Sequence, residues 1–446
     1  MKLSSSGRYA PPPLAANDAT AWAGEAHPTA ALICAIGFFM RIILSGPVLN
    51  ILGLDYGSED ANTLAKIHPG TYFIILSFLV LVCSRRNPFE QIFRIARQHT
   101  AFFSFVMIYV VILIYWLIRG PKGIGLILDV HIVMPICAIV FSYAPKTWCR
   151  NIVYLFGALM VLNSVVGIFE SATHIRLFPF DPDWEVLKQD YFRASALMGH
   201  PLTNASFTAV GMFVMLSIRM PTWLKSVIFL IMLSSLVAFG GRSALGFCVA
   251  GLAIIGVVNI KKYFTAGRLT VLHMMLGLLV VLLVPILCIA LLYVAIHSGM
   301  GERLMAYNSL NDDSASVRLL VFRVFNFMTP ADMIFGVDGD RINEIAYHTG
   351  VANPMSDIEN PWVLMFMFLG GIMFTIWFGG LSATVWRLMA GASPALKMAV
   401  IEYFVVSTTS NSFGRKDPVY LIMAGIVVCA KRLKELENSK QRETSP

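Results

Sequence analysis

The sequence predicts an all-α membrane protein, a polytopic bundle of about 12 transmembrane helices. The chain is 57% hydrophobic and only 13% charged, whereas about a quarter of the residues in a soluble domain are charged. Apolar runs of roughly 17–25 residues recur along the chain, and this is the length that crosses the hydrocarbon core as a helix. Because each backbone polar group in lipid must be satisfied internally, these runs indicate helices packed as a bundle.

The spans are expected at about 30–53, 68–83, 101–118, 124–144, 151–170, 204–219, 224–240, 243–260, 270–297, 361–386, 396–412 and 418–430. If the N-terminus lies inside, most Lys and Arg residues fall in the inside loops and tails. Most of the acidic loop residues then fall outside. The positive-inside rule therefore predicts that both termini are cytoplasmic.

The bundle is expected to occupy residues 29–430. Residues 1–28 contain Pro11-Pro12-Pro13 and no apolar core ahead of a cleavage site, which favours a disordered cytoplasmic tail over a signal peptide. Residues 431–446 form a basic cytoplasmic tail. The inside loops are short, and we expect them to be simple connectors.

Two extracytoplasmic loops, 171–203 and 298–360, are much longer than the others. Loops of this length are usually functional or disordered, and both are rich in aromatic and apolar residues, which argues against disorder. In the second loop, residues 316–328 are predicted to form a helix that Pro330 stops. No internal repeat is present, which weakens a transporter hypothesis because many transporters are built from repeats.

Other ligand classes are not favoured by the composition. The net charge of +8 is spread over short inter-helix loops, so it reflects topology, and we expect no nucleic-acid partner. The cysteines mostly lie in apolar runs without a CxxC pair and are expected to be small core residues. Asp338-Gly-Asp340 is more typical of a turn than of a cation site, so no metal and no cofactor are predicted.

Several cations lie on the outer side. Arg193 stands in the first long loop, and Arg318 and Arg323 stand in the second. Arg242 follows Gly240-Gly241 in a tight turn that places it at the mouth of the bundle. Arg242 is either an interfacial arginine with its charge in the headgroups or a clamp on phosphate, for which arginine is well suited.

Histidines and carboxylates accompany these cations. His200 precedes Pro201 and either aims the following helix or contacts a ligand. His348 lies in the second loop. Asp357, Glu359 and Asn360 precede Pro361-Trp362, where that loop re-enters the membrane. Glu359 either caps the helix or acts as a general base beside the arginines.

Four ionisable residues fall inside predicted spans, and their cost in lipid predicts that they face the bundle interior. Arg41 and Asp129 are expected to pair with each other. His131 and Glu402, together with Asp129, are the residues that a proton-driven transporter would use. We favour buried pairing over a proton relay.

The motifs of the outer loops resemble those of the O-antigen ligase/polymerase superfamily, membrane glycosyltransferases with the C-type fold. The resemblance covers roughly residues 190–375 and rests on four motifs in order: Arg193…Gly199-His200-Pro201; Gly241-Arg242-Ser243-Ala244; Ser316-Val-Arg318…Pro330…Phe335-Gly336-Val-Asp-Gly339; and Glu359-Asn360-Pro-Trp362…Gly370-Gly371.

This resemblance implies a function in the plasma (inner) membrane, the polymerisation of undecaprenyl-diphosphate-linked repeat units into exopolysaccharide or O-antigen. Arg193 and Arg242 would hold the diphosphate, and Glu359 would be the base. Arg318, Arg323, His200, His348, Asp357 and Asn360 would contact substrate. Components of a polysaccharide export machinery are further candidate partners.

Two alternatives remain open. One is an O-antigen ligase that transfers polymer to lipid A core. Ligases usually carry a histidine where this chain has Glu359, and this difference favours a polymerase; His348 is the other candidate base. The second alternative is a polysaccharide or lipid transporter.

Overall fold

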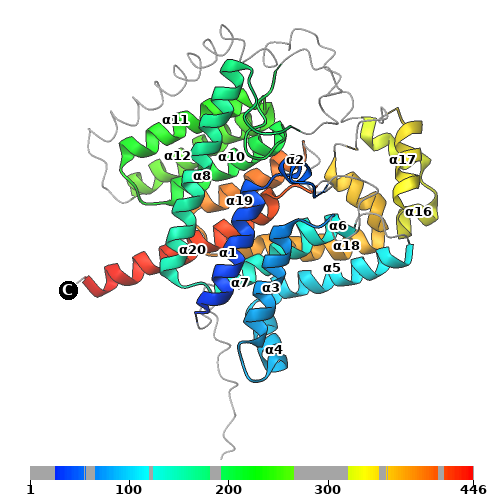
Figure 1. Ribbon diagram of the computed structural model, residues 1–446, viewed down its shortest axis with the longest axis horizontal. Coiled ribbons are helices and arrows are strands. Elements are labelled where there is room, and N and C mark those ends of the chain that lie inside the picture. The colour runs from blue at the N-terminus through cyan, green and yellow to red at the C-terminus, as the bar shows by residue number, and fades with distance from the viewer. Residues whose placement is uncertain are drawn as a thin grey trace, which may run out of the picture.

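The computed structural model describes residues 26–54, 56, 66–119, 124–180, 192–265, 320–350, 358, 360–409 and 416–444. Every regular element in these ranges is a helix (Figure 1), so the all-α prediction is confirmed. The helices are α1 (Pro28–Ile43), α2 (Gly46–Ile51), α3 (Pro69–Cys83), α4 (Pro88–Gln98), α5 (Thr100–Arg119), α6 (Ile124–Leu126), the π-helix η1 (Ile127–Ile132), α7 (Val133–Ser142), α8 (Lys146–Thr173), α10 (Pro201–Ser217), α11 (Thr222–Ala238), α12 (Arg242–Thr265), the 3₁₀ helix η3 (Val321–Phe327), α16 (Pro330–Phe335), α17 (Gly339–His348), α18 (Pro361–Met389), α19 (Pro394–Ser407) and α20 (Val419–Thr444).

Three of the described helices, α5, α8 and α18, are long and apolar enough to cross a membrane. A fourth span is counted if α3 and α4, which meet at a bend of 110°, are taken as one. Shorter apolar helices occupy 28–43, 127–142, 201–217, 222–238 and 242–258. By length and composition the structure therefore supports a polytopic membrane protein. The count of about twelve spans stays a prediction, and the expected span 270–297 lies outside the described residues.

The observed boundaries differ from the predicted ones in several places. The expected span 30–53 is two helices, because the chain leaves helical geometry at Leu44 and Ser45 between α1 and α2. The inside loop 84–100 is not a simple connector, since it contains α4. The helix of the last predicted span continues beyond residue 430 into the basic segment, because α20 extends through Thr444.

The predicted helix 316–328 is described only from Leu320 onwards. Leu320 is helical, and the chain continues as the 3₁₀ helix η3, which ends at Phe327. Pro330 does not stop that helix; it is the first residue of α16, whose N-cap Thr329 forms a capping box with Asp332. Proline at the first helical position loses no hydrogen bond, because that N–H has no partner within the helix.

Helices α7 and α20 form the centre of the bundle. Both pack against several neighbours, and the first half of α20, Val419–Cys429, is buried on all sides. Helices α5, α8 and α18 instead expose apolar residues such as Ile118, Leu162 and Ile376. A helix that is apolar all round belongs in a core or in lipid, so these exposed apolar residues are suited to contact acyl chains.

Polar contacts gather at the two ends of the bundle. At one end the backbone of His27 bonds Tyr143, and Arg432 donates to Ser142 O. The other end holds the beginnings of α3, α10 and α12, where polar groups from the turns meet. This grouping agrees with the alternation of loops that the charge pattern predicts.

A glycine pair attaches the helices of the second outer loop to the bundle. Within α18, Gly370 has φ +65°, which breaks the helix. Gly336, at the end of α16, has φ +77°, and the two backbones are so close that a Cβ at either glycine would lie 2.7 Å or less from backbone atoms of the other. Val337 N–H donates to Met367 O at 2.7 Å, and the Tyr115 hydroxyl donates to Phe335 O. Two motifs that are separate in the sequence therefore meet at this break.

We predict that Gly370→Ala lowers the thermal stability of the purified protein. A non-glycine residue in this conformation costs about 1–3 kcal/mol, and its Cβ would lie 2.3 Å from Gly336 N. Gly379→Ala in the same helix is the control, since nothing lies within 4 Å of its Cβ position and alanine favours helix. Equal melting temperatures for the two variants would contradict this account.

Candidate functional site

Arg193 lies against the turn that carries Arg242. The Arg193 side chain is only 4% exposed, and its Nε and Nη2 both donate to Phe239 O at 3.2 Å. The neighbouring Ala194 N–H donates to Ala238 O at 3.4 Å. Arg193 thus caps the C-terminal end of α11, where carbonyl groups carry partial negative charge. Arg193 is therefore held beside the turn that carries Arg242.

The turn of Arg242 packs closely on α10. Gly240 has φ +64°, and a Cβ at Gly241 would lie 2.4 Å from Ala205 Cβ. Two glycines therefore allow the turn to approach the first turn of α10. Arg242 begins α12 and is half-buried. Ser243 accepts a hydrogen bond from Thr409 at 2.8 Å.

His200 and Asn204 organise the start of α10. His200 is the N-cap, and its Nδ1 accepts from Thr203 N–H at 3.5 Å. This contact agrees with the first of the two predicted roles of His200, which is to orient the helix that follows it. Asn204 donates to Ser195 O and His200 O and accepts from Met198 N–H. The loop is consequently tied down over its last ten residues.

Glu170, near the end of α8, binds backbone groups of the same loop, residues 171–203. It is fully buried, and its carboxylate accepts from four backbone N–H groups. Oε2 accepts from Ser195 and Ala196, both at 2.9 Å. Oε1 accepts from Leu177 at 2.9 Å and Phe178 at 3.4 Å. One carboxylate thus joins both described ends of the first outer loop.

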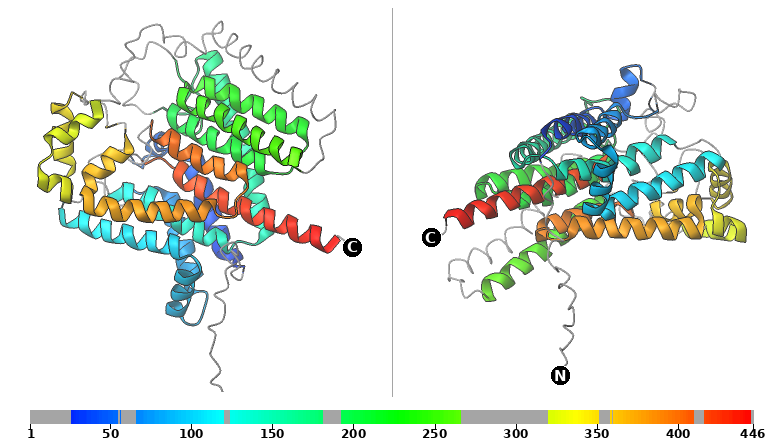
Figure 2. Two further views of the ribbon diagram at one scale, coloured as in Figure 1. Left: turned by 180° about the vertical axis from the view of Figure 1, so that it is seen from behind. Right: turned by 90° about the horizontal axis from the view of Figure 1, so that it is seen from below.

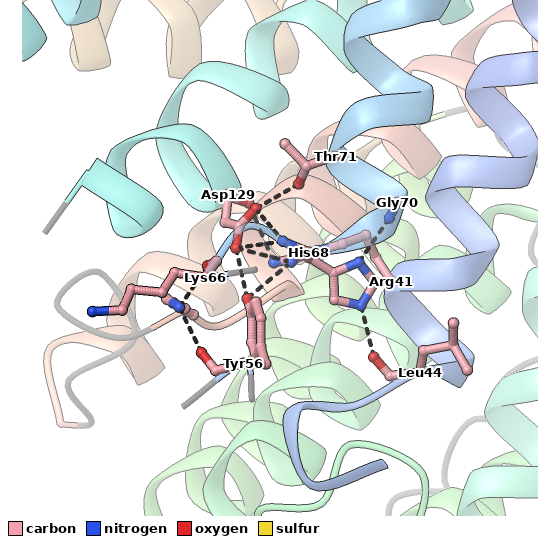
Figure 3. Close-up of polar contacts among 9 residues, drawn as sticks. Arg41, Leu44, Tyr56, Lys66, His68, Gly70, Thr71 and Asp129 are labelled. Atoms are coloured by element: carbon pink, nitrogen blue, oxygen red, sulfur yellow. Dashed lines mark hydrogen bonds and ion pairs between the residues drawn. The ribbon is translucent and has the colours of Figure 1, made fainter. Parts of the chain in front are cut away.

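Asp129 forms a second buried anionic centre, in the π-helix η1 (Figure 3). It pairs with Arg41 at 3.8 Å, and both side chains are almost fully buried. It also accepts from the Tyr56 and Thr71 hydroxyls, each at 2.7 Å, and from His68 N–H at 3.0 Å. The predicted Arg41–Asp129 pair is confirmed.

The ring of His68 is a neutral link in this cluster. Its Nδ1 accepts from Gly70 N–H at 2.9 Å, and its Nε2 lies 2.7 Å from Leu44 O (Figure 3). A carbonyl only accepts, so Nε2 carries the proton and Nδ1 does not. Burial raises the pKa of the Tyr56 phenol, which therefore remains a donor to Asp129.

Lys416 and Asp417, just before α20, lie between the two centres. Lys416 donates to Tyr56 O at 2.9 Å and to Lys66 O at 2.7 Å, and it lies 4.0 Å from the Tyr56 ring centroid. The next residue, Asp417, accepts from Thr203 at 3.3 Å and from Val419 N–H at 2.8 Å. Polar contacts therefore connect the beginnings of α3, α10 and α20 at this end of the bundle.

The remaining predicted site residues are placed differently. Asn360 is the N-cap of α18 and accepts from the N–H groups of Trp362 and Val363, so this cap does not need Glu359. Arg323 and His348 are exposed; the ring of His348 stacks on Phe327 at 6.2 Å. They belong to η3 and α17, at the edge of the bundle away from α10 to α12 (Figures 1 and 2). Arg318, Asp357 and Glu359 lie outside the described residues.

The other intramembrane residues are also buried, as predicted. Glu402 is 2% exposed and accepts from the Cys248 thiol at 3.7 Å. The His131 ring stacks on Tyr109 with centroids 4.8 Å apart. No group of described residues has the composition of a metal site. Among the described cysteines none is in a disulfide.

Sequence reasoning missed Glu170 and Lys416. Glu170 stands at the end of an apolar run, where an acid is usually a boundary residue. Only its position immediately before a long outer loop could have suggested that it bonds that loop. Lys416 gave no signal, because its partners are backbone carbonyls far away in the sequence. Comparison of the chain with models of known protein families, and with characterised proteins, gives no match.

We predict that Glu170→Gln destabilises the protein and loosens the first outer loop. An amide has one accepting oxygen, so at least one pair of buried N–H groups loses its acceptor, at about 1–3 kcal/mol for each group. Protease sensitivity at 174–200 and the melting temperature are the measurements. Glu344→Gln, which breaks the exposed pair with Arg341, is the control and is expected to change neither. A Glu170→Gln variant as stable as the control would refute the role of the carboxylate.

The pH dependence of stability tests the burial of Lys416. Burial lowers the pKa of Lys416 from 10.5 to about 8; nearby Asp129 opposes the shift, and Arg41 and Lys66 add to it. Above pH 8 the folded protein loses a proton that the unfolded chain still binds. The free energy of unfolding therefore increases with pH between about pH 8 and about pH 10.4. The neutral amine keeps donors for both carbonyls.

Relative to Lys416→Met, the melting temperature of the wild type should therefore rise between pH 8 and 10. Measurements at pH 7, 8.5 and 10 give this difference directly. A difference that is independent of pH would show that Lys416 keeps its ordinary pKa, and a difference that falls would show that its pKa is raised; either result would contradict this account.

Proposed function

We propose that this protein is a membrane glycosyltransferase that polymerises undecaprenyl-diphosphate-linked repeat units at the outer face of the plasma (inner) membrane. The observation that carries the proposal is the packing of Arg193 on Phe239 O, beside the turn of Arg242. Two cations from separate loops thereby share one end of the bundle. An anionic ligand with two phosphates suits such a pair, because arginine forms bidentate, permanently charged contacts with phosphate oxygens.

The proposed reaction is a displacement at an anomeric carbon. A hydroxyl of the acceptor sugar attacks this carbon of the donor glycan, and the bond to undecaprenyl diphosphate breaks with its electron pair. Arg193 and Arg242, with Arg318, stabilise the charge that grows on the leaving diphosphate. Glu359 accepts the proton of the attacking hydroxyl. The diphosphate is a good leaving group, so this scheme uses no cofactor.

Fixed geometry of the outer end supports this assignment. Reactants held in the correct orientation react faster, because the entropy of positioning has already been lost. Glu170 and Asn204 hold the Arg193 loop, and Gly241 packs the Arg242 turn on α10. The lipid of the donor would lie along apolar helix surfaces, with the diphosphate at the membrane surface.

The environment of Asp129 argues against the transporter alternative. A carboxylate that relays protons needs a state in which it is neutral and a route by which the proton arrives. Asp129 is paired with Arg41 and accepts three further hydrogen bonds. Protonation would leave Arg41 buried without its counter-ion, which is strongly unfavourable. This residue fits a structural ion pair better than a proton carrier.

Purified protein incubated with an undecaprenyl-diphosphate-linked repeat unit should produce a ladder of longer glycans. Arg242→Ala is predicted to lower the rate at least about 100-fold, in the range found when a group that stabilises developing charge is removed. Arg193→Lys keeps the charge but loses the two-nitrogen contact with Phe239 O, and we expect an intermediate rate. Arg219→Ala, an exposed cation at the opposite end, is the control.

The products distinguish the three candidate functions. Transfer of preformed polymer to a lipid A core, with no ladder from single repeats, would identify a ligase. Proton-gradient-dependent movement of glycan across liposomes without new glycosidic bonds would identify a transporter. A full ladder from Arg242→Ala would refute the proposed role of that arginine.

A further inference from the structure

The helix α4 has the geometry of a segment that lies along a membrane surface. It follows α3 after the polar residues 84–87, and the two helix axes meet at 110°. If α3 crosses the bilayer, α4 therefore runs nearly parallel to its plane. Its 11 residues cover about 16 Å at 1.5 Å per residue. Asn87 caps its start by accepting from Phe89 and Glu90 N–H groups.

The position of α4 in the bundle fixes the side of the membrane. Gln98, its last residue, accepts from the Tyr143 hydroxyl at 2.6 Å, and His99 bonds Ser142 at 3.1 Å. Tyr143 O in turn accepts from His27 N–H. The helix thus lies at the end of the bundle where α1 begins, opposite to the candidate site.

Three faces of α4 have different surroundings. Gln91 and Ile95, one turn apart, are buried against the bundle. Phe89 and Phe93, also one turn apart, are 74% and 65% exposed. The third face carries Glu90, Arg94 and Arg97, the last of which is exposed. The apolar exposed face and the basic face are adjacent.

We propose that α4 binds the anionic phospholipids of the leaflet at the end of the bundle where α1 begins. Phe89 and Phe93 insert among the acyl chains, as the apolar face of an interfacial helix does. Arg86, Arg94 and Arg97 bind phosphate groups of lipids in the same leaflet, since their stems can lie on apolar surface while the charge stays at headgroup depth.

The charge balance selects the class of lipid. The segment 85–98 holds four arginines against a single acid, Glu90. A lipid with a zwitterionic headgroup would offer acyl chains to the two phenylalanines, but its headgroup would give little net attraction to this excess positive charge. An anionic headgroup such as phosphatidylglycerol satisfies both, and juxtamembrane basic clusters are attracted to such surfaces. This inference does not depend on the proposed enzymatic function.

Amide hydrogen exchange of the full-length protein in lipid nanodiscs tests the proposal. Nanodiscs of phosphatidylcholine alone are compared with nanodiscs that also contain phosphatidylglycerol. Exchange over residues 88–98 is expected to be several-fold slower with phosphatidylglycerol. The triple variant R86Q/R94Q/R97Q should lose this difference, and R86K/R94K/R97K should keep most of it.

A matched control removes three exposed cations elsewhere at the same end, in the variant R150Q/R219Q/K397Q, which should behave as wild type. Exchange over α3 and α5 reports whether each variant is folded. Equal exchange over 88–98 in the two lipid mixtures would overturn the proposal. It would also be overturned if inorganic phosphate added to phosphatidylcholine nanodiscs gave the same protection, because the lipid surface would then be unnecessary.

Discussion

Two buried carboxylates, Asp129 and Glu170, are surrounded by hydrogen-bond donors and organise the end of the bundle where α3 and α10 begin. Asp129 and Glu170 have no exposed side-chain surface. An unpaired ion in such surroundings would cost several kcal/mol even after the protein relaxes. Each one therefore draws donors from segments that are far apart in the sequence. The loops that supply these donors cannot move away without leaving a buried charge unsatisfied.

The two centres hold different parts of the chain and are joined by one short segment. Asp129 fixes the end of α1, the start of α3 and Tyr56. Glu170 fixes both described ends of the first outer loop. Lys416 and Asp417, adjacent in sequence, each contact one of these parts. Residues 416–417 therefore lie between the two parts and contact both.

Hydropathy and the cost of buried charge could predict the helical character, the approximate position of the apolar helices and the Arg41–Asp129 pair. They could not predict the breaks after Ile43 and at Gly370, because the apolar run continues across both. The helix α4 was missed for a different reason. Its pattern repeats over only 11 residues, and its arginines were taken as a topological signal alone.

For the two arginines of the candidate site, the sequence predicted the shared end of the bundle but not the detailed arrangement. That Arg193 and Arg242 belong to one end of the bundle followed from the alternation of loops. Their arrangement did not, because it depends on the close approach of Gly241 to Ala205 and on a carbonyl acceptor at Phe239. Glu170 was not recognised because an acid at the end of an apolar run is compatible with exposure. Contacts between side chains and distant backbone groups leave no periodic pattern in a sequence.

The break in α18 determines how the second outer loop returns to the bundle. Before Gly370, Val363, Leu364 and Met367 of α18 pack with residues of η3 and α17 in a separate apolar cluster, which also buries Val337 and Ile358. The Val337–Met367 hydrogen bond and the contact between Gly336 and Gly370 attach this cluster at the break. Trp362, two residues after the N-cap Asn360, also contacts the rings of Trp377 and Phe378. The start of α18 is therefore positioned both by this cluster and by the part of α18 after the break.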